Sequence, residues 1–298
     1  MFLVKYVIML ETISIKTLNL MIRGDIMNKV ITIGKKDFQI GKRTYIMGIL
    51  NVTPDSFSDG GKFNNIELAI KHAKQMEEEG ADIIDVGGES TRPSYDPVSE
   101  QEELERVIPI IGTLSKCINI PISIDTYKGK VAEESLKAGA SLINDVWGFK
   151  RDPHMAEVAA HYRVPCCLMH NRDNRNYKNL MDDVLTDLQE SIDIALKAGV
   201  DPKNIITDPG IGFAKDYEQN LAVMNQLERL SELGYPVLLG TSRKSMVGKA
   251  LDLPVNERIE GTVATTVIGI MKKCDFVRVH DVKENKRAAV MADAIIRR

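Results

Sequence analysis

The sequence predicts a (β/α)8 barrel, in the α/β class, with a short N-terminal β-hairpin ahead of it. Short apolar runs recur eight times along the chain, and several of the helical patterns between them end at a glycine. The loops that follow the apolar runs are longer and more polar than the loops that precede them. The repeating unit occupies residues 45–298, close to the roughly 250 residues typical of such a barrel.

The first predicted element is the hairpin, with strands at Val30–Ile33 and 37–40 and a turn at 34–36. Eight barrel strands follow it. Their apolar residues run without alternation, which suits parallel strands buried on both faces. The predicted strands are Tyr45–Asn51, 82–86, 121–125, 141–144, 165–169, 204–207, 236–239 and 275–279.

The helices are predicted from their apolar period and their end signals. In the segment 179–198 apolar residues recur at every fourth position, which gives one buried stripe. The segment 99–115 begins with Ser99 as N-cap and has Glu102 three residues later, the pattern of a capping box. Glycine follows the helical patterns in "EEEGADIIDVGG" and "LKAGASLINDVWG", as expected for a left-handed C-cap.

Composition excludes several classes of protein. Apolar residues make up 44% of the chain, charged residues 27%, and the net charge is −3. This charge predicts no general attraction to nucleic acid or to an acidic membrane surface. No apolar run approaches the roughly 20 residues that a membrane helix needs. The four cysteines form no CxxC pair, so we expect reduced thiols in a cytoplasmic protein.

Residues 1–26 do not fit the repeating unit. They resemble a signal peptide only loosely, because the basic start and the small-residue cleavage site are missing. We expect a poorly ordered extension, or a translated leader ahead of a start at Met27. The rest of the chain, 27–298, is then one barrel domain.

Every predicted strand ends in a group that can hydrogen-bond or carry charge. Asp and Asn are good helix caps and turn formers, which explains one or two such ends. Eight of them indicate a site at the carboxyl ends of the strands, where barrel enzymes build their active sites. The ends are Asn51, 89–92, Asp125, 144–145, 170–171, Asp208, 242–244 and 278–281.

The charges at these ends fall into two kinds. Asp125, Asn144 and Asp208 offer acceptors and an amide, which suit a planar heterocycle rich in N–H donors. Arg278 and His280 follow strand eight, where barrels often place an anion site.

At these residues the chain resembles the dihydropteroate synthases, a family of pterin-binding barrels. The resemblance covers nearly everything from Met27 to the end of the chain. It rests on "NVTPDSFSDGG", "GGESTRP", "SIDT", "IND", "LMHN", "DPGIGFAK", "GTSRKS" and "RVHD", which occur in the family's order. Two departures are visible: Ser94 stands where glycine is common, and Met246-Val247 where Phe-Ile is often seen.

The resemblance implies roles for matching residues. The pterin ring would be held by Asp125, Asn144, Met169, Asp208 and Lys244. The diphosphate would be held by Asn51, Arg278 and His280, with Asn51 also at a Mg²⁺ ion. The 4-aminobenzoate pocket would be formed by Phe57, Ser90, Thr91, Arg92, Pro93 and Ser245, and the catalytic residues would be Asp59, Lys244 and Arg278.

The implied reaction displaces diphosphate from (7,8-dihydropterin-6-yl)methyl diphosphate by the amine of 4-aminobenzoate, giving 7,8-dihydropteroate. The resemblance also implies a homodimer. The outer helix predicted at 261–273 agrees with one, because small and β-branched residues surround much of it.

Three other functions remain open at this stage. A pterin-binding methyltransferase shares the Asp and Asn grip on the pterin, but it needs neither a diphosphate site nor the long first loop. The motifs "TPDSFSDGG", "SRKS" and "RVHD" favour the synthase. A Schiff-base aldolase would use Lys244, with Arg243 lowering its pKa, although Schiff-base lysines usually lie within a strand. A non-catalytic pterin carrier would bind pterin and release no diphosphate.

Overall fold

The computed structural model describes residues 30–52, 62–89 and 97–297. Eight parallel strands are hydrogen-bonded in the order β8-β7-β6-β5-β4-β3-β10-β9. A parallel bridge between Thr207 and Val237 joins the first and last of them, so the predicted barrel is confirmed. The strands are β3 (Tyr45–Asn51), β4 (Ile83–Gly87), β5 (Ile122–Asp125), β6 (Leu142–Asp145), β7 (Cys166–Met169), β8 (Ile205–Asp208), β9 (Leu238–Leu239) and β10 (Phe276–Val279).

Most strands begin one residue later than the sequence predicts, and β9 is the shortest. Pro236, which precedes β9, has no N–H to give to a neighbouring strand. Its carbonyl still accepts from the Thr207 N–H at 2.9 Å, and this contact helps to close the barrel.

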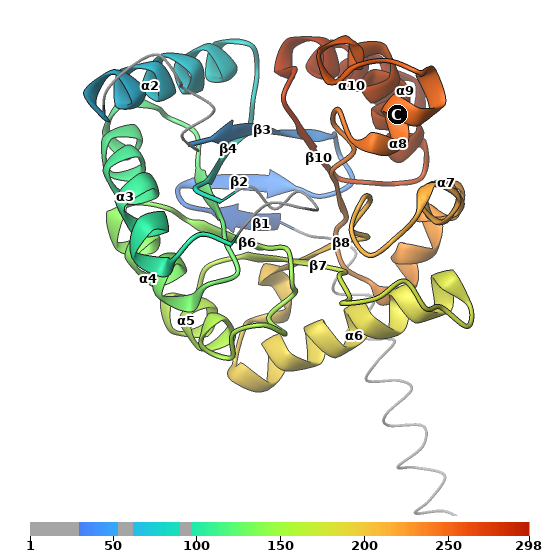
Figure 1. Cartoon of the computed structure of the whole chain (residues 1–298), viewed down its shortest axis with the longest axis horizontal. Coiled ribbons are helices and arrows are strands. Elements are labelled where there is room, and N and C mark those ends of the chain that lie inside the picture. The colour runs from blue at the N-terminus through green and yellow to red at the C-terminus, as the bar shows by residue number, and fades with distance from the viewer. Residues whose placement is uncertain (1–29, 53–61, 90–96, 298) are drawn as a thin grey trace, which may run out of the picture.

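The helices form a ring outside the strands (Figure 1). Each barrel strand is followed by at least one helix, as a (β/α)8 barrel requires. They are α2 (Lys62–Glu78), α3 (Glu100–Cys117), α4 (Gly129–Ala138), α5 (His154–Tyr162), α6 (Leu180–Ala198), α7 (Tyr217–Asn225), α8 (Ser245–Leu251), α9 (Ile259–Met271) and α10 (Val282–Ile296), with short 3-10 turns at Pro202–Asn204, Leu227–Leu233 and Val255–Glu257.

The predicted caps are confirmed in part. Helices α4 and α6 end at Gly139 and Gly199, which have φ of 122° and 97°. The Ser99 hydroxyl accepts from the Glu102 N–H at 3.2 Å at the start of α3. The Glu102 carboxylate pairs with Arg106, so among the described contacts only the first half of the capping box forms.

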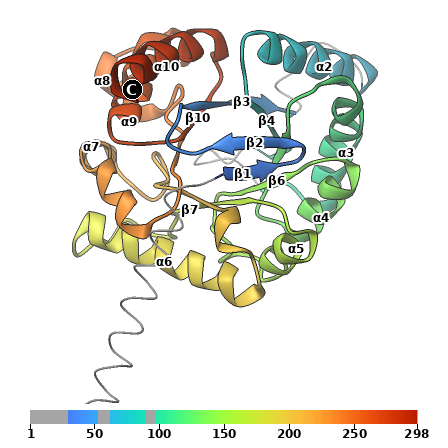
Figure 2. The same cartoon turned by 180° about the vertical axis from the view of Figure 1, so that it is seen from behind.

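The hairpin closes the amino-terminal end of the barrel (Figure 2). Its strands are β1 (Val30–Ile33) and β2 (Lys36–Gln39), and they pair antiparallel. Ile31, Ile33 and Phe38 are buried in a cluster with residues at the starts of the barrel strands. This end is therefore filled with apolar side chains, which leaves the carboxyl ends of the strands for polar groups.

Strand register brings the expected site residues to one level. Asn51 lies opposite Gly87, Gly87 opposite Asp125, and Asp125 opposite Asn144. Three polar side chains on three different strands therefore share one row at the carboxyl mouth.

The structure also bears on the expectations about the cysteines and about membrane helices. The four cysteines are free thiols, and three of them are buried. Among the described helices none is long and apolar enough to cross a membrane. The expectation about residues 1–26 lies outside the described residues.

Candidate active site

Polar side chains from five strand ends converge at the carboxyl mouth of the barrel. Asp125, Asn144 and Asp208 are each less than a tenth exposed. Gly240, which follows β9, marks the meeting point on the other side. A Cβ there would lie 3.9 Å from Asp208 Oδ2, from the Lys244 Nζ and from the Arg278 Cβ. The absence of a side chain at position 240 keeps this space open.

Arg278 is held by two carboxylates inside the mouth. Its Nε donates to Asp85 Oδ2 at 2.6 Å, and its Nη2 donates to Asp125 Oδ2 at 2.6 Å. Asn144 donates from Nδ2 to the same Asp85 oxygen at 3.1 Å. Asp85 is fully buried, so it fixes a residue expected at the diphosphate and a residue expected at the pterin ring.

Two of the buried carboxylate oxygens that lack a donor among the described residues belong to Asp85 and Asp125, the partners of Arg278. Oδ1 of Asp85 and Oδ1 of Asp125 have no hydrogen-bond partner among the described residues. Buried polar atoms are nearly always paired, and an unpaired one suggests a missing ligand or water. Burial raises the pKa of Asp125, and Arg278 opposes that rise. The mouth therefore has acceptors available for a ligand that brings N–H groups.

Lys244 and Asp208 form the second half of the mouth. Lys244 Nζ donates to the Ile211 carbonyl and lies 4.7 Å from the centre of the Phe213 ring. Burial lowers the pKa of Lys244 to about 8, and Asp208 opposes that shift. Asp208 Oδ1 accepts from the Gly210 N–H at 2.7 Å.

The remaining predicted pterin residue and the aldolase alternative can also be placed. Met169 is buried at the end of β7, opposite Asp208 in register. Lys244 is the N-cap of α8 and does not lie within a strand. Arg243 turns toward Asp281, with 2.9 Å between Nε and Oδ2. These positions give no support to a Schiff base.

The residues expected at the diphosphate lie around the same mouth. His280 Nδ1 lies 2.9 Å from the Ser242 hydroxyl, which also accepts from the His280 N–H at 3.1 Å. The Asn51 amide lies close to Asp125, since a Cβ on Gly87 would be 3.8 Å from Asn51 Oδ1 and 3.6 Å from Asp125 Oδ2.

A magnesium ion fits the chemistry of Asn51. Mg²⁺ prefers oxygen ligands and usually keeps several waters and substrate phosphate oxygens in its shell. Among the described residues no cluster of three or more His, Cys, Asp or Glu side chains is placed to hold a metal. The carboxamide oxygen of Asn51 is one ligand of the kind that Mg²⁺ prefers.

Part of the predicted site lies outside the described residues, namely Phe57, Asp59, Ser90, Thr91, Arg92 and Pro93. The chain next to these segments is anchored. Val52 N–H donates to the Gly87 carbonyl at 2.9 Å, and Arg106 Nη1 donates to the Gly88 carbonyl at 2.7 Å. Ser245 is exposed at the first residue of α8, beside Lys244.

Sequence reasoning did not single out Asp85 and Lys215. Asp85 is a carboxylate inside the apolar strand "IIDVG", and that position was the available signal. Lys215 ends the motif "DPGIGFAK", and it is only 4% exposed. A lysine is almost never that buried without dedicated partners.

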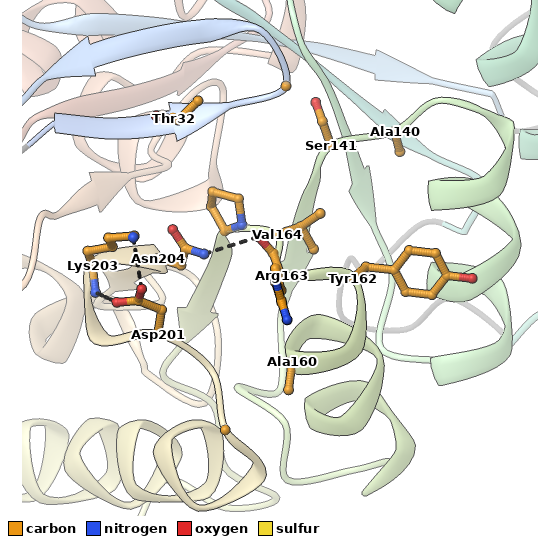
Figure 3. Close-up of a pocket in the computed structure, with 13 residues that line it drawn as sticks. Thr32, Ala140, Ser141, Ala160, Tyr162, Arg163, Val164, Asp201, Lys203 and Asn204 are labelled. Carbon is orange, nitrogen blue, oxygen red and sulfur yellow. Dashed lines mark hydrogen bonds and ion pairs between the residues drawn. The ribbon is translucent and has the colours of Figure 1, made fainter.

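A polar pocket of about 730 Å³ lies at the opposite end of the barrel (Figure 3). Its walls include Thr32 of the hairpin and residues just ahead of three strands, Ser141, Pro165 and Asn204. None of the predicted site residues lines it. The carboxylates, Lys244 and Arg278 all belong to the other mouth, so that mouth is the candidate active site.

The chain is similar to known proteins along most of its length. The profile of the pterin binding enzyme family matches residues 47–280, so the chain belongs to that family. A dihydropteroate synthase of Clostridium beijerinckii is 71% identical over 267 residues, which cover 89% of this chain and 99% of that protein. The activity of the chain is accordingly that of a dihydropteroate synthase, a transferase of folate biosynthesis.

Solved structures show the same likeness. The crystal structure of the Clostridium difficile dihydropteroate synthase in the presence of pteroic acid has a TM-score of 0.86 and 57% identity, covering 88% of this chain and all of that one. The Xanthomonas albilineans dihydropteroate synthase with 4-aminobenzoic acid has a TM-score of 0.86 and 38% identity, covering 90% and 98%.

Proposed function

We propose that the carboxyl mouth of this barrel is where (7,8-dihydropterin-6-yl)methyl diphosphate and 4-aminobenzoate condense to 7,8-dihydropteroate and diphosphate. The observation that carries this proposal is the buried Oδ1 of Asp125, which has no donor among the described residues. The amino group and ring N–H groups of a pterin supply such donors. The ligands named for the two solved relatives, pteroic acid and 4-aminobenzoic acid, are consistent with it.

The pterin ring is proposed to lie among the residues of the two half-sites. Asp125 and Asp208 accept from the ring, and Asn144 adds an amide that can both donate and accept. Lys244 donates to an acceptor atom of the ring. Met169 is buried beside Asp208 and offers an apolar surface to the ring face.

The diphosphate is proposed to bind between Asn51, His280 and Arg278. Two N–H groups of Arg278 are used by Asp85 and Asp125, and a guanidinium has further donors. A charged donor at this point lies beside both the ring and the leaving group. Asn51 would hold Mg²⁺, which would supply charge stabilisation for the leaving diphosphate.

The chemistry needs no strong general base. The amine of 4-aminobenzoate is neutral at pH 7, and it attacks the methylene carbon as the carbon–oxygen bond to diphosphate breaks. The amine proton then leaves to solvent or to the diphosphate. Asp125 and Asp208 stabilise positive charge that develops on the pterin, and Arg278 stabilises negative charge on the leaving group.

The second substrate is proposed to bind at the rim of the mouth. Ser245 is exposed there, and Phe57, Ser90, Thr91, Arg92 and Pro93 would complete the 4-aminobenzoate pocket. Asp59 would help these residues to hold 4-aminobenzoate when both substrates are present.

A homodimer is proposed from an apolar face on the last two helices. Met271 on α9 and Val290, Met291 and Ile295 on α10 are each 59–63% exposed. Helices α9 and α10 lie side by side in the ring (Figure 1). Exposed apolar side chains gathered on neighbouring helices mark interaction surfaces, and a second copy of the chain can cover them. The free thiols suit a cytoplasmic enzyme.

Release of diphosphate tests the proposed reaction. The chain is incubated with the pterin diphosphate and Mg²⁺, with and without 4-aminobenzoate, and diphosphate and pteroate are measured together. We expect one diphosphate for each pteroate, and release that depends on 4-aminobenzoate. Release at the same rate without 4-aminobenzoate would indicate hydrolysis, and no release would indicate a pterin carrier.

A further inference from the structure

A buried ammonium, an imidazole and a carboxylate form a connected chain beside the proposed pterin site. Lys215 is 4% exposed and His170 is fully buried. Lys215 Nζ lies 2.8 Å from His170 Nδ1, and His170 Nε2 lies 3.0 Å from Asp187 Oδ2. Arg172 donates to both oxygens of Asp187 from the other side. Four side chains from three parts of the chain are thus joined in one network.

The partners define the protonation of this network. An ammonium only donates, so His170 Nδ1 accepts and the ring proton lies on Nε2, facing Asp187. Burial lowers the pKa of His170 to about 4, which agrees with a neutral ring. Lys215 Nζ also donates to the carbonyls of Gly210 at 3.0 Å and Phe213 at 3.2 Å. Three acceptors match the three N–H groups of an ammonium.

The two bonded carbonyls belong to the loop 210–213, which contacts the proposed ring-binding residues. Ile211, between them, gives its carbonyl to Lys244. The Phe213 ring lies 4.7 Å from Lys244 Nζ. The Gly210 N–H donates to Asp208 at 2.7 Å. A change in the shape of this loop would move the surroundings of Lys244 and Asp208 together.

The loop 210–213 also packs closely against the backbone of His170. Gly210 has φ of 67°, a conformation that favours glycine. A Cβ at this position would lie 2.0 Å from the His170 carbonyl oxygen. The backbone of the loop and the network that holds it are therefore fitted to each other.

We infer that Lys215, supported by His170 and Asp187, is a positioning residue for pterin binding. Its ammonium holds the loop 210–213 in the shape that presents the Ile211 carbonyl and the Phe213 ring to Lys244. The inference rests on the proposed role of Lys244 in holding the ring. Lys215 acts through Lys244 and does not itself touch the substrate.

A double-mutant cycle tests this inference. The variants Lys215→Met, Lys244→Met and the double variant are titrated with pterin-6-carboxylate, a non-reactive pterin, by calorimetry. Lys286→Met is the matched control, because Lys286 is a partly buried lysine that pairs with Asp82. Asp82 comes just before β4, so this pair lies at the other end of the barrel. Thermal unfolding of each variant is recorded beside the titration.

Lys215→Met is expected to weaken pterin binding at least tenfold in the parent chain and less than threefold once Lys244 is Met, because residues that act as a unit are not additive. The KM of Lys215→Met for 4-aminobenzoate should stay within twofold of the parent value. The pterin affinity of Lys286→Met should also stay within twofold of the parent value. Should Lys215→Met fail to fold, Lys215→Gln, which keeps two N–H donors, is carried through the same cycle.

Equal losses in both backgrounds, or unchanged affinity in Lys215→Met, would overturn the inference. A purely structural role would lower the melting temperature and still give additive losses. Failure of the proposed function is separate from both, since it would appear in the unmodified chain as no release of diphosphate that depends on 4-aminobenzoate.

Discussion

Arg278 and Asp125 are joined across the mouth of the barrel by a hydrogen bond of 2.6 Å between Nη2 and Oδ2. They lie on β10 and β5, which are not neighbours in the sheet. One is proposed to bind the diphosphate and the other the pterin ring. The contact therefore joins, before the substrate binds, the two residues that are proposed to hold its two ends.

Replacing Arg278 should affect binding of the diphosphate and binding of the pterin ring to different degrees. Arg278→Ala is expected to weaken binding of the pterin diphosphate more than binding of 6-hydroxymethylpterin, by about 1.5–3 kcal/mol, the worth of a charge-assisted hydrogen bond. Calorimetric titration of both ligands measures the difference. Arg43→Ala is the control, since Arg43 is paired with Asp82 ahead of the strands. Equal losses for the two ligands would place Arg278 on the ring alone.

Binding of 4-aminobenzoate should depend on the first substrate. Asp59 lies outside the described residues and follows Asn51, the residue proposed at the diphosphate and Mg²⁺, shortly after it in the sequence. We expect 4-aminobenzoate to bind more tightly with pterin and diphosphate present, with a coupling of about 1–3 kcal/mol. Asp59→Ala should reduce that coupling and leave pterin affinity nearly unchanged. Identical 4-aminobenzoate affinities with and without the first ligands would contradict this account.

Acid should destabilise the fold through His170. Burial lowers its pKa to about 4 from an ordinary value of 6.5. Between these values the unfolded chain binds a proton that the folded chain does not, so stability falls as the pH drops through this window. The contribution is up to about 3 kcal/mol. Burial lowers the pKa of the facing Lys215 to about 7, so this lysine is mainly protonated well below that value. Against the effect of burial, hydrogen bonds with His170 and Arg172 lower the pKa of Asp187, which therefore stays ionised in this window.

Urea unfolding at pH 7 and at pH 4 measures this effect. The parent chain should lose more stability between the two values than His170→Gln, which has no titrating ring. The same loss in both proteins would assign the pH dependence to other groups.

The apolar face on α9 and α10 should be the dimer contact. Met271→Asp and Val290→Asp are expected to shift the protein toward monomer in sedimentation at micromolar concentration, because each would bury a charge in an apolar interface. Leu68→Asp is the control, since Leu68 is an exposed apolar residue on α2, outside the proposed contact. A parent chain that sediments only as a monomer would refute the proposed dimer.

The sequence was a good guide to the elements and to the row of strand ends. Short apolar runs and glycine caps are local signals, so β3 and the ends of α4 and α6 were placed correctly. The ion pair of Arg278 with Asp85 was not predicted, because it joins residues 193 positions apart. The partner of a carboxylate inside an apolar strand cannot be predicted from the local sequence, because the two residues come together only when the barrel closes.

The half-formed capping box and the network of Lys215 were missed for related reasons. Glu102 can serve Ser99 or Arg106, and spacing alone does not choose between them. Lys215 looks like an ordinary residue at the end of a motif, because its partners His170 and Asp187 lie on other elements. Local pattern predicts elements, whereas these contacts depend on how the elements come together.

The central claim is that Oδ1 of Asp125, which has no donor among the described residues, accepts from the pterin ring. The most direct test is calorimetric titration of pterin-6-carboxylate into the parent chain and Asp125→Asn, with Asp275→Asn as a control, since Asp275 is a buried carboxylate ahead of β10. Loss of a charged acceptor should weaken binding by about 1.5–3 kcal/mol in Asp125→Asn and leave it unchanged in Asp275→Asn. Affinity within twofold of the parent value in Asp125→Asn would contradict the account.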